Sequence, residues 1–595
     1  MLYKDLQTFM KQLEDKGELK KIDAKVSSDL EITEITDRVS KTHGPGLLFT
    51  NVEGSKYPVL MNAMGSYKRM SMGLGADSLD EIATEIEAYI KISNYLSIRK
   101  LFRNIPRFLR LIHVFPIKSI FKGKCQQVIE REVDLSTIPI LKCWPEDAGR
   151  FVTLPLVFTK DRNTKRQNVG MYRMQVLDKQ STGMHWHKHK DGSEIYSEYF
   201  NNKEKMPVSV ALGCDPAITY AATAPLPKMI DEMMLAGWLR KSNVKMVKCI
   251  TNDIYVPSNA EIVLEGYVDT TEDLVLEGPF GDHTGYYSIA DYYPRFHVTC
   301  ITHKKNAVYP ATIVGKPPME DCYMAKATER IFLPILKMQM PELIDINLPL
   351  EGVFHNCAIV SIHNKYPGCG RKIMNAIWGM GQMMYTKLIV VVDETVNVGN
   401  LGQVLDAVLH YVEGEKDFIF TQGPLDALDH SSNEAMYGTR VGIDATNKAR
   451  KHNGQKDIDA LYKNKRDSLK KEHNDNVAYS SYKNLNIKGY HILAISKEKP
   501  FHGREVLREY LEQNTDKITV VVDKEVDPND LSTVLWKVFN NIDGKRDIVF
   551  LDGKIGIDAT KKWKEEGLTR EWPNDINMSS DIKEKVTKRW TEYGI

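Results

Sequence analysis

The C-terminal third of the chain contains two copies of one sequence pattern, and this repeat limits the possible folds more than any other feature. Three pairs of segments match: 354–374 with 490–507, 387–396 with 517–526, and 441–448 with 555–562. Each copy predicts a strand, a helix, a strand, and then a second helix followed by a Gly-Ile-Asp-Ala-Thr turn. Runs such as Ile-Val-Val-Val are typical of buried strands in parallel sheets. The repeat therefore predicts two small α/β modules built on one plan.

The rest of the sequence divides into segments of different character. At 595 residues the chain is too long for a single hydrophobic core. Residues 448–476 are dense in charge and poor in apolar residues, which predicts a solvated helix or tether outside the core. The predicted domains are an α/β domain at 1–122, a split β-barrel at 123–318, a first α/β copy at 319–447, an insertion at 448–486, and a second copy with the C-terminal tail at 487–595.

Hydrophobic periodicity and turn residues predict individual elements within these segments. We expect helices over 6–16, 78–93, 225–239 and 319–340, and strands over 44–52, 57–65, 256–268 and 295–303. Segments 168–176 and 184–192 are expected to pair as a hairpin, in which His185, His187 and His189 would share one face.

The amino-acid composition indicates the cellular compartment of the protein and the classes of partner that it can bind. The net charge is +1 and 42% of the residues are hydrophobic, a balance that does not indicate a nucleic-acid-binding protein. The eight cysteines are scattered and include no Cys-x-x-Cys pair, so we expect reduced thiols in a cytoplasmic protein rather than a zinc ribbon or a disulfide framework. No run of 18 apolar residues occurs, so no membrane-spanning helix is expected.

A basic amphipathic segment at 99–124 allows two interpretations. It interleaves Arg and Lys with Leu, Phe and Ile and contains no acidic residue. Such a segment can lie on an anionic membrane surface, which would place the protein peripherally at the inner face of the membrane. Pro106 and Pro116 interrupt the pattern, and they favour a domain-joining segment with a solvated basic face.

A turn at 277–288, EGPFGDHTGYYS, places Glu277 and Asp282 on either side of a Gly-Pro-Phe-Gly sequence. The aromatic pair Tyr286 and Tyr287 follows and can supply an apolar wall. Desolvation against such a wall would raise the pKa of one of the two acids, which suits a general acid near neutral pH. The alternative is a surface turn with ordinary solvated acids.

The histidines of 184–192 also leave several possibilities open. Three same-face imidazoles are compatible with zinc, whereas the interleaved Trp186, Lys188 and Lys190 favour an ordinary packed or solvated strand. A single histidine joined by oxygen ligands would suit Mg²⁺ or Mn²⁺. Glu232, near the start of the predicted helix at 225–239, lies where the helix dipole favours a carboxylate.

Taken together, these motifs resemble the UbiD family of decarboxylases, which use prenylated flavin mononucleotide on aromatic and α,β-unsaturated acids. The resemblance rests on NVGMYRMQV, MHWHKHKDG, DEMMLAGWLR, CITNDIYVPSNAEIVLEGYV and EGPFGDHTGYY, which occur in this order, and it extends from the N-terminus to about residue 450. It is strongest to the members that decarboxylate 4-hydroxy-3-polyprenylbenzoate. The implied activity is that of a carboxy-lyase with prenylated FMN and Mn²⁺, and the family also allows K⁺ beside the Mn²⁺.

The resemblance assigns site residues by position. It implies Asn168, Glu232 and His189 as metal ligands, with His187 as an alternative to His189 or an addition to it. The residues that would line the flavin are Met171, Tyr172, Arg173, His185, Trp186, His187, Lys190 and Asp191, and Lys387 would reach the cofactor phosphate. Arg173, Glu277 and Asp282 would form the catalytic network. Asp282 would protonate the carbon that loses carbon dioxide, and Glu277 would tune the cofactor together with Arg173.

The resemblance also implies partners, and the sequence departs from it in one respect. It implies a flavin prenyltransferase as supplier of the cofactor and a homo-oligomer with a hinge near residue 319. The family has one C-terminal domain of this type, so the second copy indicates an insertion or partial duplication. Two other functions stay compatible with the residues: a flavin-binding carrier without turnover, and a flavin oxidoreductase, although the chain lacks a Gly-x-Gly-x-x-Gly nicotinamide fingerprint.

Overall fold

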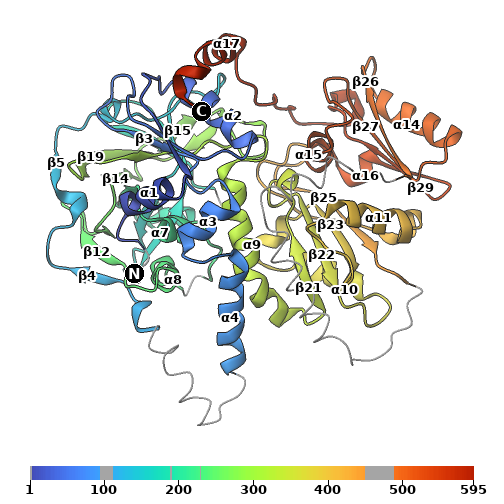
Figure 1. The fold of residues 1–595 in the computed structure, drawn as a ribbon, viewed down its shortest axis with the longest axis horizontal. Helices are drawn as coiled ribbons and strands as arrows, with labels where there is room; N and C mark the ends of the chain where they lie inside the picture. The colour runs from blue at the N-terminus through green and yellow to red at the C-terminus, as the bar shows by residue number, and fades with distance from the viewer. Residues whose placement is uncertain (1–2, 94–110, 188–190, 228–229, 449–487) are drawn as a thin grey trace.

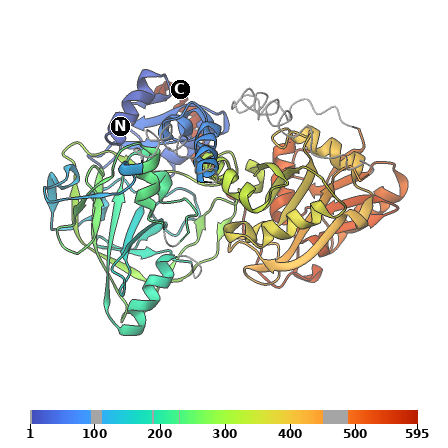
Figure 2. The same cartoon turned by 90° about the horizontal axis from the view of Figure 1, so that it is seen from below.

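The computed structural model describes residues 3–93, 111–187, 191–227, 230–448 and 488–595. The N-terminal and central parts of the chain lie together on one side, the two repeat copies lie on the other, and helix α9 (Glu320–Gln339) runs between them (Figures 1 and 2). None of the described helices has both the length and the apolar character needed to cross a membrane.

The N-terminal part pairs a short sheet with amphipathic helices. Helix α1 (Leu6–Asp15) buries the four apolar residues that its periodicity predicts, and Asp5 accepts a hydrogen bond from the Thr8 amide at its start. The other helices are α2 (Glu31–Lys41), α3 (Tyr67–Leu74) and α4 (Leu79–Ser93). The sheet has the order β1-β2-β3-β20, from strands Leu19–Ile22, Gly46–Phe49, Val59–Met61 and Tyr309–Pro310. Its last strand comes from far along the chain, which joins this part to the central one.

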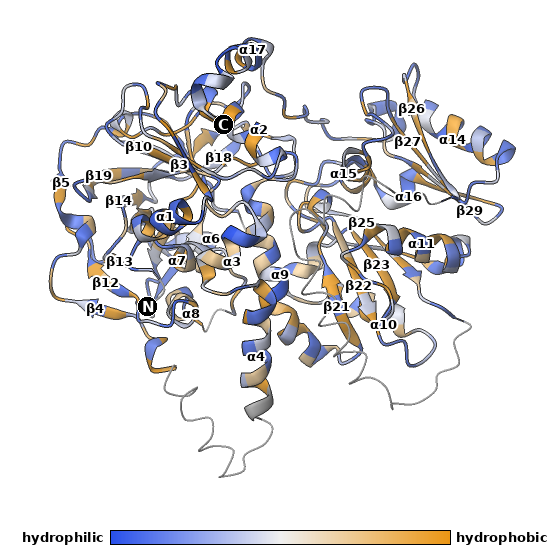
Figure 3. Cartoon of the chain, viewed as in Figure 1, coloured by the Kyte–Doolittle hydropathy of each residue, from blue (hydrophilic) through white to orange (hydrophobic). Residues whose placement is uncertain are grey.

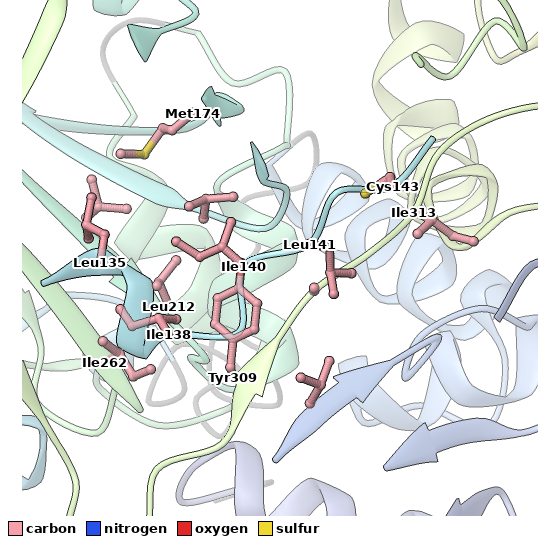
Figure 4. Close-up of a cluster of buried hydrophobic side chains, with 14 of the residues drawn as sticks. Leu135, Ile138, Ile140, Leu141, Cys143, Met174, Leu212, Ile262, Tyr309 and Ile313 are labelled. Carbon is pink, nitrogen blue, oxygen red and sulfur yellow. The ribbon is translucent and has the colours of Figure 1, made fainter. Parts of the chain in front are cut away.

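The central part is built on a nine-stranded sheet that curls into a half-barrel. Its order is β6-β9-β10-β19-β14-β11-β7-β8, with β5 beside β19. The strands are β5 (Val128–Glu130), β6 (Phe151–Val152), β7 (Leu156–Lys160), β8 (Gln167–Met171), β9 (Met174–Val176), β10 (Ser181–Met184), β11 (Lys205–Leu212), β14 (Ile262–Asp269) and β19 (Arg295–His303). Buried side chains from this sheet and from segment 135–143 form one core with the N-terminal part (Figure 4).

Three predicted boundaries in this part are wrong. Segments 168–176 and 184–192 do not pair as one hairpin, because β8 pairs with β7 while β9 pairs with β10. The predicted helix at 225–239 begins only at α8 (Glu232–Leu239), since the Asp231 side chain caps it at the Met233 amide. The predicted strand at 256–268 is two strands, β13 (Tyr255–Pro257) and β14, which belong to different sheets. The remaining central helices are α6 (Asp191–Asn202) and α7 (Pro216–Ala221).

The described end of the basic segment forms part of a small sheet. Strand β4 (Ile117–Ser119) pairs in parallel with β12 (Lys245–Lys248), which also pairs with β13. Ile120 and Phe121 are 94% and 76% exposed, so the apolar residues here face outward. Residues 99–110 of the segment lie outside the described residues, and contact with a membrane stays a prediction.

The two repeat copies have the same topology. The first sheet has the order β21-β22-β23-β25-β24 and the second has β26-β27-β29-β28, so the described residues of the second copy contain an equivalent of every strand except β21. The strands are β21 (Leu343–Asn347), β22 (Cys357–Ile362), β23 (Leu388–Asp393), β24 (Phe418–Pro424), β25 (Tyr437–Ala445), β26 (Tyr490–Ile495), β27 (Ile518–Asp523), β28 (Ile548–Leu551) and β29 (Lys554–Asp558). Helices α10 (Cys369–Trp378) and α11 (Leu401–Tyr411) correspond to α14 (His502–Gln513) and α15 (Leu531–Asn541), and α16 (Gly544–Asp547) follows in the second copy. The duplication inferred from the sequence is therefore a duplication of structure.

The copies pack against each other and against the rest of the molecule. Val404 and Phe418 of the first copy share one core cluster with Val534 and Ile548 of the second. Figure 3 shows largely hydrophobic residues along β22 and β23. Along α11 and α14 it shows both hydrophobic and hydrophilic residues, as expected for helices that cover a sheet. After the second copy the chain returns to the N-terminal part, where α17 (Ser580–Lys588) lies beside α2 (Figure 1). Lys585 and Arg589 pair there with the buried Glu31.

Candidate active site

The turn after β15 (Val275–Glu277) is held by buried hydrogen bonds. Gly278 has a φ of +93°, which a side chain would strain. Its amide donates to Gln175 Oε1 at 2.8 Å, and the amide of Gly281, in β16 (Phe280–Gly281), donates to Asp147 Oδ1 at 2.7 Å. Strand β17 (Tyr287–Ser288) pairs with β16, and β18 (Asp291–Tyr293) pairs with β15. Glu277 and Asp282 are thus fixed by the backbone, as their turn sequence predicts.

Arg173, between β8 and β9, joins the two acids. Its Nε and Nη2 lie 2.9 and 3.1 Å from the two carboxylate oxygens of Glu277, and its Nη1 bonds to Asp282. Nη2 also donates to the Ser288 hydroxyl at 3.1 Å, and the guanidinium lies 4.7 Å from the centre of the Phe280 ring. A guanidinium can satisfy two carboxylates because its donors form a planar fork. The three residues proposed as a catalytic network therefore do lie together.

The charge state of this network differs from the expectation. Burial alone would raise the pKa of Glu277, but Arg173 and His185 lower it to about 2. Burial likewise opposes ionisation of Asp282, whereas Arg173 and then His283 hold its pKa below its usual range. The prediction that desolvation raises the pKa of one of these acids is wrong, because the guanidinium outweighs it. Both carboxyls are therefore anions near neutral pH, and neither holds a proton of its own to donate.

Histidines extend the network from both acids. His185 Nδ1 lies 2.9 Å from Glu277 Oε2, and His185 Nε2 lies 2.9 Å from His187 Nε2. On the other side, His283 Nδ1 lies 2.9 Å from Asp282 Oδ1, and His283 Nε2 lies 2.9 Å from His355 Nε2. Because β10 ends at Met184, His185 and His187 are not on a strand as predicted, and their imidazoles contact each other instead of lining a sheet face.

An acid from the first repeat copy completes the group. Asp426 Oδ1 lies 3.8 Å from His355 Nε2, and one ligating atom each of His283, His355 and Asp426 lie within 4.8 Å of one another. Asp426 also interacts electrostatically with His187. His283, His355 and Asp426 were not among the residues predicted from the sequence. One signal was present, since His283 directly follows Asp282.

A second carboxylate site lies at the start of α8. The Val169 amide, next to Asn168 in β8, donates to Glu232 Oε2 at 3.4 Å. Burial raises the pKa of Glu232 to about 7, and the charges of Asp231 and Asp191 add to this effect. Among the described residues no cationic side chain pairs with Glu232. A buried carboxylate with no cation beside it is destabilised, and a bound metal ion would supply the missing charge. The predicted ligand His189 lies outside the described residues.

Residues predicted to line the flavin gather near this carboxylate. The Gly192 amide, in the first turn of α6, donates to the Tyr172 hydroxyl at 3.4 Å, and Asp191 begins the same helix. Trp186 is buried, and its indole N–H has no hydrogen-bond partner within the described part of the chain. A Cβ on Gly192 would lie 2.7 Å from that nitrogen, so the glycine leaves room for the indole. Met171 packs between two hydrophobic clusters, and Lys190 lies outside the described residues.

Lys387 does not take the predicted position. Its ammonium is buried and lies 2.7 Å from Asp429 Oδ2, 3.1 Å from Ser431 Oγ and 3.1 Å from the Asn540 carbonyl oxygen. An ammonium has three protons, and these three acceptors use all of them. Lys387 therefore binds the second copy to the first in this structure and has no donor left for a phosphate.

Comparison with protein-family models covers most of the chain. Three models of 3-octaprenyl-4-hydroxybenzoate carboxy-lyase match the chain. The N-terminal domain model matches residues 10–86, and the Rift-related domain model matches residues 118–317. The C-terminal domain model matches residues 322–445 and 482–563. The chain belongs to the UbiD family. The C-terminal model covers both repeat copies, so the second copy consists of UbiD-type sequence.

Relatives and solved structures agree with this membership. An uncharacterized protein of Archaeoglobus fulgidus is 48% identical over 76% of this chain and 93% of its own length. An uncharacterized protein of Helicobacter pylori J99 is 37% identical over 98% of this chain and 96% of its own, so it shares the additional length. The closed form of vanillic acid decarboxylase from Sedimentibacter hydroxybenzoicus has a TM-score of 0.66 at 25% identity, covering 79% of this chain and 99% of that one. The UbiD-class enzyme HmfF from Pelotomaculum thermopropionicum, in complex with FMN, has the same TM-score at 24% identity, covering 77% and 98%, and shows the shared fold.

Proposed function

We propose that this UbiD-family chain is a non-oxidative decarboxylase of an aromatic acid, of the 4-hydroxy-3-polyprenylbenzoate type, that works with prenylated FMN and a divalent metal ion. One observation carries the proposal: Arg173 bonds to both Glu277 and Asp282 inside a buried site. Burying an ion triad of this kind is costly for stability, which favours a functional reason for keeping it. The matching family is named for a carboxy-lyase, and the similar Sedimentibacter hydroxybenzoicus protein is a vanillic acid decarboxylase, so both support the reaction type.

The chain's residues fit the cofactor. In the described part of the chain Glu232 has no cationic partner, and its carboxylate accepts from the amide of Val169, the residue after Asn168. A carboxylate and an amide oxygen are ligands that suit Mn²⁺. The indole N–H of Trp186, which no described residue accepts, and the first turn of α6 offer donors for an anionic group such as a phosphate. We assign the metal to Asn168 and Glu232, with His189 as the further predicted ligand. When bound, prenylated FMN supplies the electron sink that decarboxylation requires.

The chain's own groups have separate tasks in this proposal. Loss of carbon dioxide leaves an electron pair on the substrate carbon, which must receive a proton. Asp282 delivers that proton, and it therefore has to be protonated transiently against the charge of Arg173. Glu277 holds Arg173 with two hydrogen bonds and so fixes the distance between Arg173 and Asp282. Exclusion of water by the buried turn strengthens these interactions.

Assembly and supply of the cofactor are part of the same proposal. A separate flavin prenyltransferase would provide the prenylated cofactor. HmfF from Pelotomaculum thermopropionicum is known in an evolved dimeric form with prenylated FMN, which supports a homo-oligomer here. The hinge would lie at the start of α9, between the central part and the first copy.

Co-production with a flavin prenyltransferase tests the function. The purified protein should contain a flavin with the mass of prenylated FMN, and it should release carbon dioxide from prenylated or simple 4-hydroxybenzoates. A protein that binds this flavin but releases no carbon dioxide from any hydroxybenzoate would favour the carrier function. A protein that binds no flavin in the presence of Mn²⁺ would contradict the proposal.

A further inference from the structure

The contact between His283 and His355 restricts where their protons can lie. The two Nε2 atoms are 2.9 Å apart, a hydrogen-bond distance that requires one proton between them. His283 Nδ1 lies 2.9 Å from a carboxylate oxygen of Asp282, and an ionised carboxylate only accepts. With Asp282 ionised, His283 carries a proton on Nδ1, and as a neutral ring its Nε2 would be an acceptor.

The proton on His355 is assigned by a chain of hydrogen bonds from the second repeat copy. The Trp536 carbonyl accepts from Asn540 Nδ2 at 2.9 Å, so Asn540 Oδ1 faces the other way. Asn540 Oδ1 accepts from Asn356 Nδ2 at 2.9 Å, which leaves Asn356 Oδ1 to accept from His355 Nδ1, also at 2.9 Å. A backbone carbonyl cannot donate, so the direction of the whole chain is determined. His355 therefore carries a proton on Nδ1, and as a neutral ring its Nε2 is an acceptor too.

Two acceptor nitrogens facing each other at this distance would repel. The group formed by Asp282, His283 and His355 must therefore contain one proton more than an ionised acid and two neutral rings. The proton can lie between the rings, which makes one of them an imidazolium, or it can pass to Asp282. These two states differ only by a shift along the 2.9 Å bond between His283 and Asp282.

The surroundings favour this additional positive charge. Three carboxyl groups face His283 from three elements: Asp282 of its own turn, Asp321 of α9 and Asp426 of the first copy. Phe354 stacks on the His283 ring at 4.8 Å and His355 covers its Nε2, so the side chain is only 17% exposed to solvent. A metal ion held by His283, His355 and Asp426 is the alternative occupant of this contact, and the number of metal ions per chain distinguishes the two.

We propose, on the basis of the decarboxylase function above, that His283 is held as an imidazolium and is the positioning residue that supplies Asp282 with the proton delivered to the substrate carbon. In the step, the Nδ1–H bond of His283 breaks and an O–H bond forms on Asp282. The O–H bond of Asp282 then breaks as a C–H bond forms on the carbon that has lost carbon dioxide. A proton from water afterwards restores His283, so each turnover consumes one substrate carboxylate and one proton and releases one carbon dioxide. The second copy takes part indirectly, because it determines the proton position on His355.

The test compares three variants of the cofactor-loaded enzyme: His283→Asn, His355→Gln, and the matched control His491→Gln. His491 is an exposed histidine of the second repeat copy, and it stacks on Tyr510. We expect His283→Asn to keep its bound flavin and to lose at least about ten-fold in kcat, within the usual range for proton-transfer residues. We expect kcat of the wild type to fall at alkaline pH. This fall should disappear in His283→Asn and move to lower pH in His355→Gln, while His491→Gln should behave as wild type.

Two readouts separate proton supply from a structural role. Small buffer acids such as imidazolium should restore turnover of His283→Asn in proportion to their concentration, which a packing defect would not allow. Side-chain ¹⁵N spectra of the wild type should show both ring nitrogens of His283 protonated at neutral pH.

Three results would overturn the inference: wild-type kcat and pH profile in His283→Asn, a neutral His283 in the spectra, or a second metal ion per chain that His355→Gln removes. A wild-type enzyme without any decarboxylation would contradict the proposed function instead.

Discussion

Trp536 of the second repeat copy stacks on Tyr286 of the turn at 277–288, with ring centroids 5.2 Å apart and planes 19° from parallel. The Trp536 indole N–H donates to the Thr284 carbonyl at 2.8 Å, and the Tyr286 hydroxyl donates to Asn541 Oδ1 at 2.7 Å. The additional copy therefore supports the backbone that follows Asp282, rather than lying apart from the site.

Removing this support should weaken both stability and catalysis. We expect Trp536→Ala to lower the free energy of unfolding by about 3–5 kcal/mol, as for other buried large-to-small changes. The turn would then hold Asp282 less firmly, so kcat should fall as well. Trp536→Phe is the matched control, because it retains the stacking and loses only the hydrogen bond. Chemical denaturation and carbon dioxide release measure the two effects, and an unchanged kcat in Trp536→Ala would show that the second copy does not support the site.

Gly285 provides an independent check of the same contact. Its φ is +85°, and a Cβ there would lie 2.6 Å from the Trp536 ring. Gly285→Ala should therefore displace α15 and strain the backbone, with a loss of about 1–3 kcal/mol in unfolding free energy. Gly567→Ala is a suitable control, since its φ is also +85° but no atom lies within 4 Å of the added Cβ. Equal losses in the two variants would mean that backbone strain alone is responsible.

Much of the fold follows from local sequence, whereas the site depends on contacts between distant segments. The repeat, helix α9 and strand β19 could be predicted because periodicity and β-branched runs report directly on burial. The start of α8 was misplaced because apolar residues continue before the Asp231 cap. The predicted pKa direction at Glu277 was wrong because only the neighbouring aromatic residues are visible in the local sequence, while Arg173 comes from another strand region. His355 and Asp426 could not be placed for the same reason.

The Glu232 carboxylate should lower the stability of the metal-free protein. The same carboxylate should be required for binding Mn²⁺ and flavin. Its pKa in the folded chain is about 7 against an ordinary 4.5, so its ionisation costs folding free energy as pH rises through this interval. We expect Glu232→Gln to raise the melting temperature of the metal-free protein near neutral pH and to abolish retention of Mn²⁺ and flavin. The exposed Glu132→Gln is the control. Retained Mn²⁺ in Glu232→Gln, measured by elemental analysis, would remove Glu232 from the metal site.

The lowered pKa of Glu277 leads to a pH dependence of stability with the opposite sign. Its pKa is depressed from 4.5 to about 2 in the folded chain, so its contribution to stability is complete above its ordinary pKa and is lost as pH falls from about 4.5 to about 2. That contribution is on the order of 3 kcal/mol. The difference in unfolding free energy between wild type and Glu277→Gln should shrink over this acid interval, whereas the difference between wild type and Glu132→Gln should stay flat. A constant difference for Glu277→Gln would contradict the assigned charge state.

The reaction in D₂O tests the central claim most directly, because it reports the bond that Asp282 is proposed to form. The cofactor-loaded wild type should release carbon dioxide from a 4-hydroxybenzoate and place one deuterium on the carbon that carried the carboxylate. Asp282→Asn should keep the flavin and form product at least about 100-fold more slowly. Product formed by Asp282→Asn at the wild-type rate, with the same deuterium content, would contradict the account.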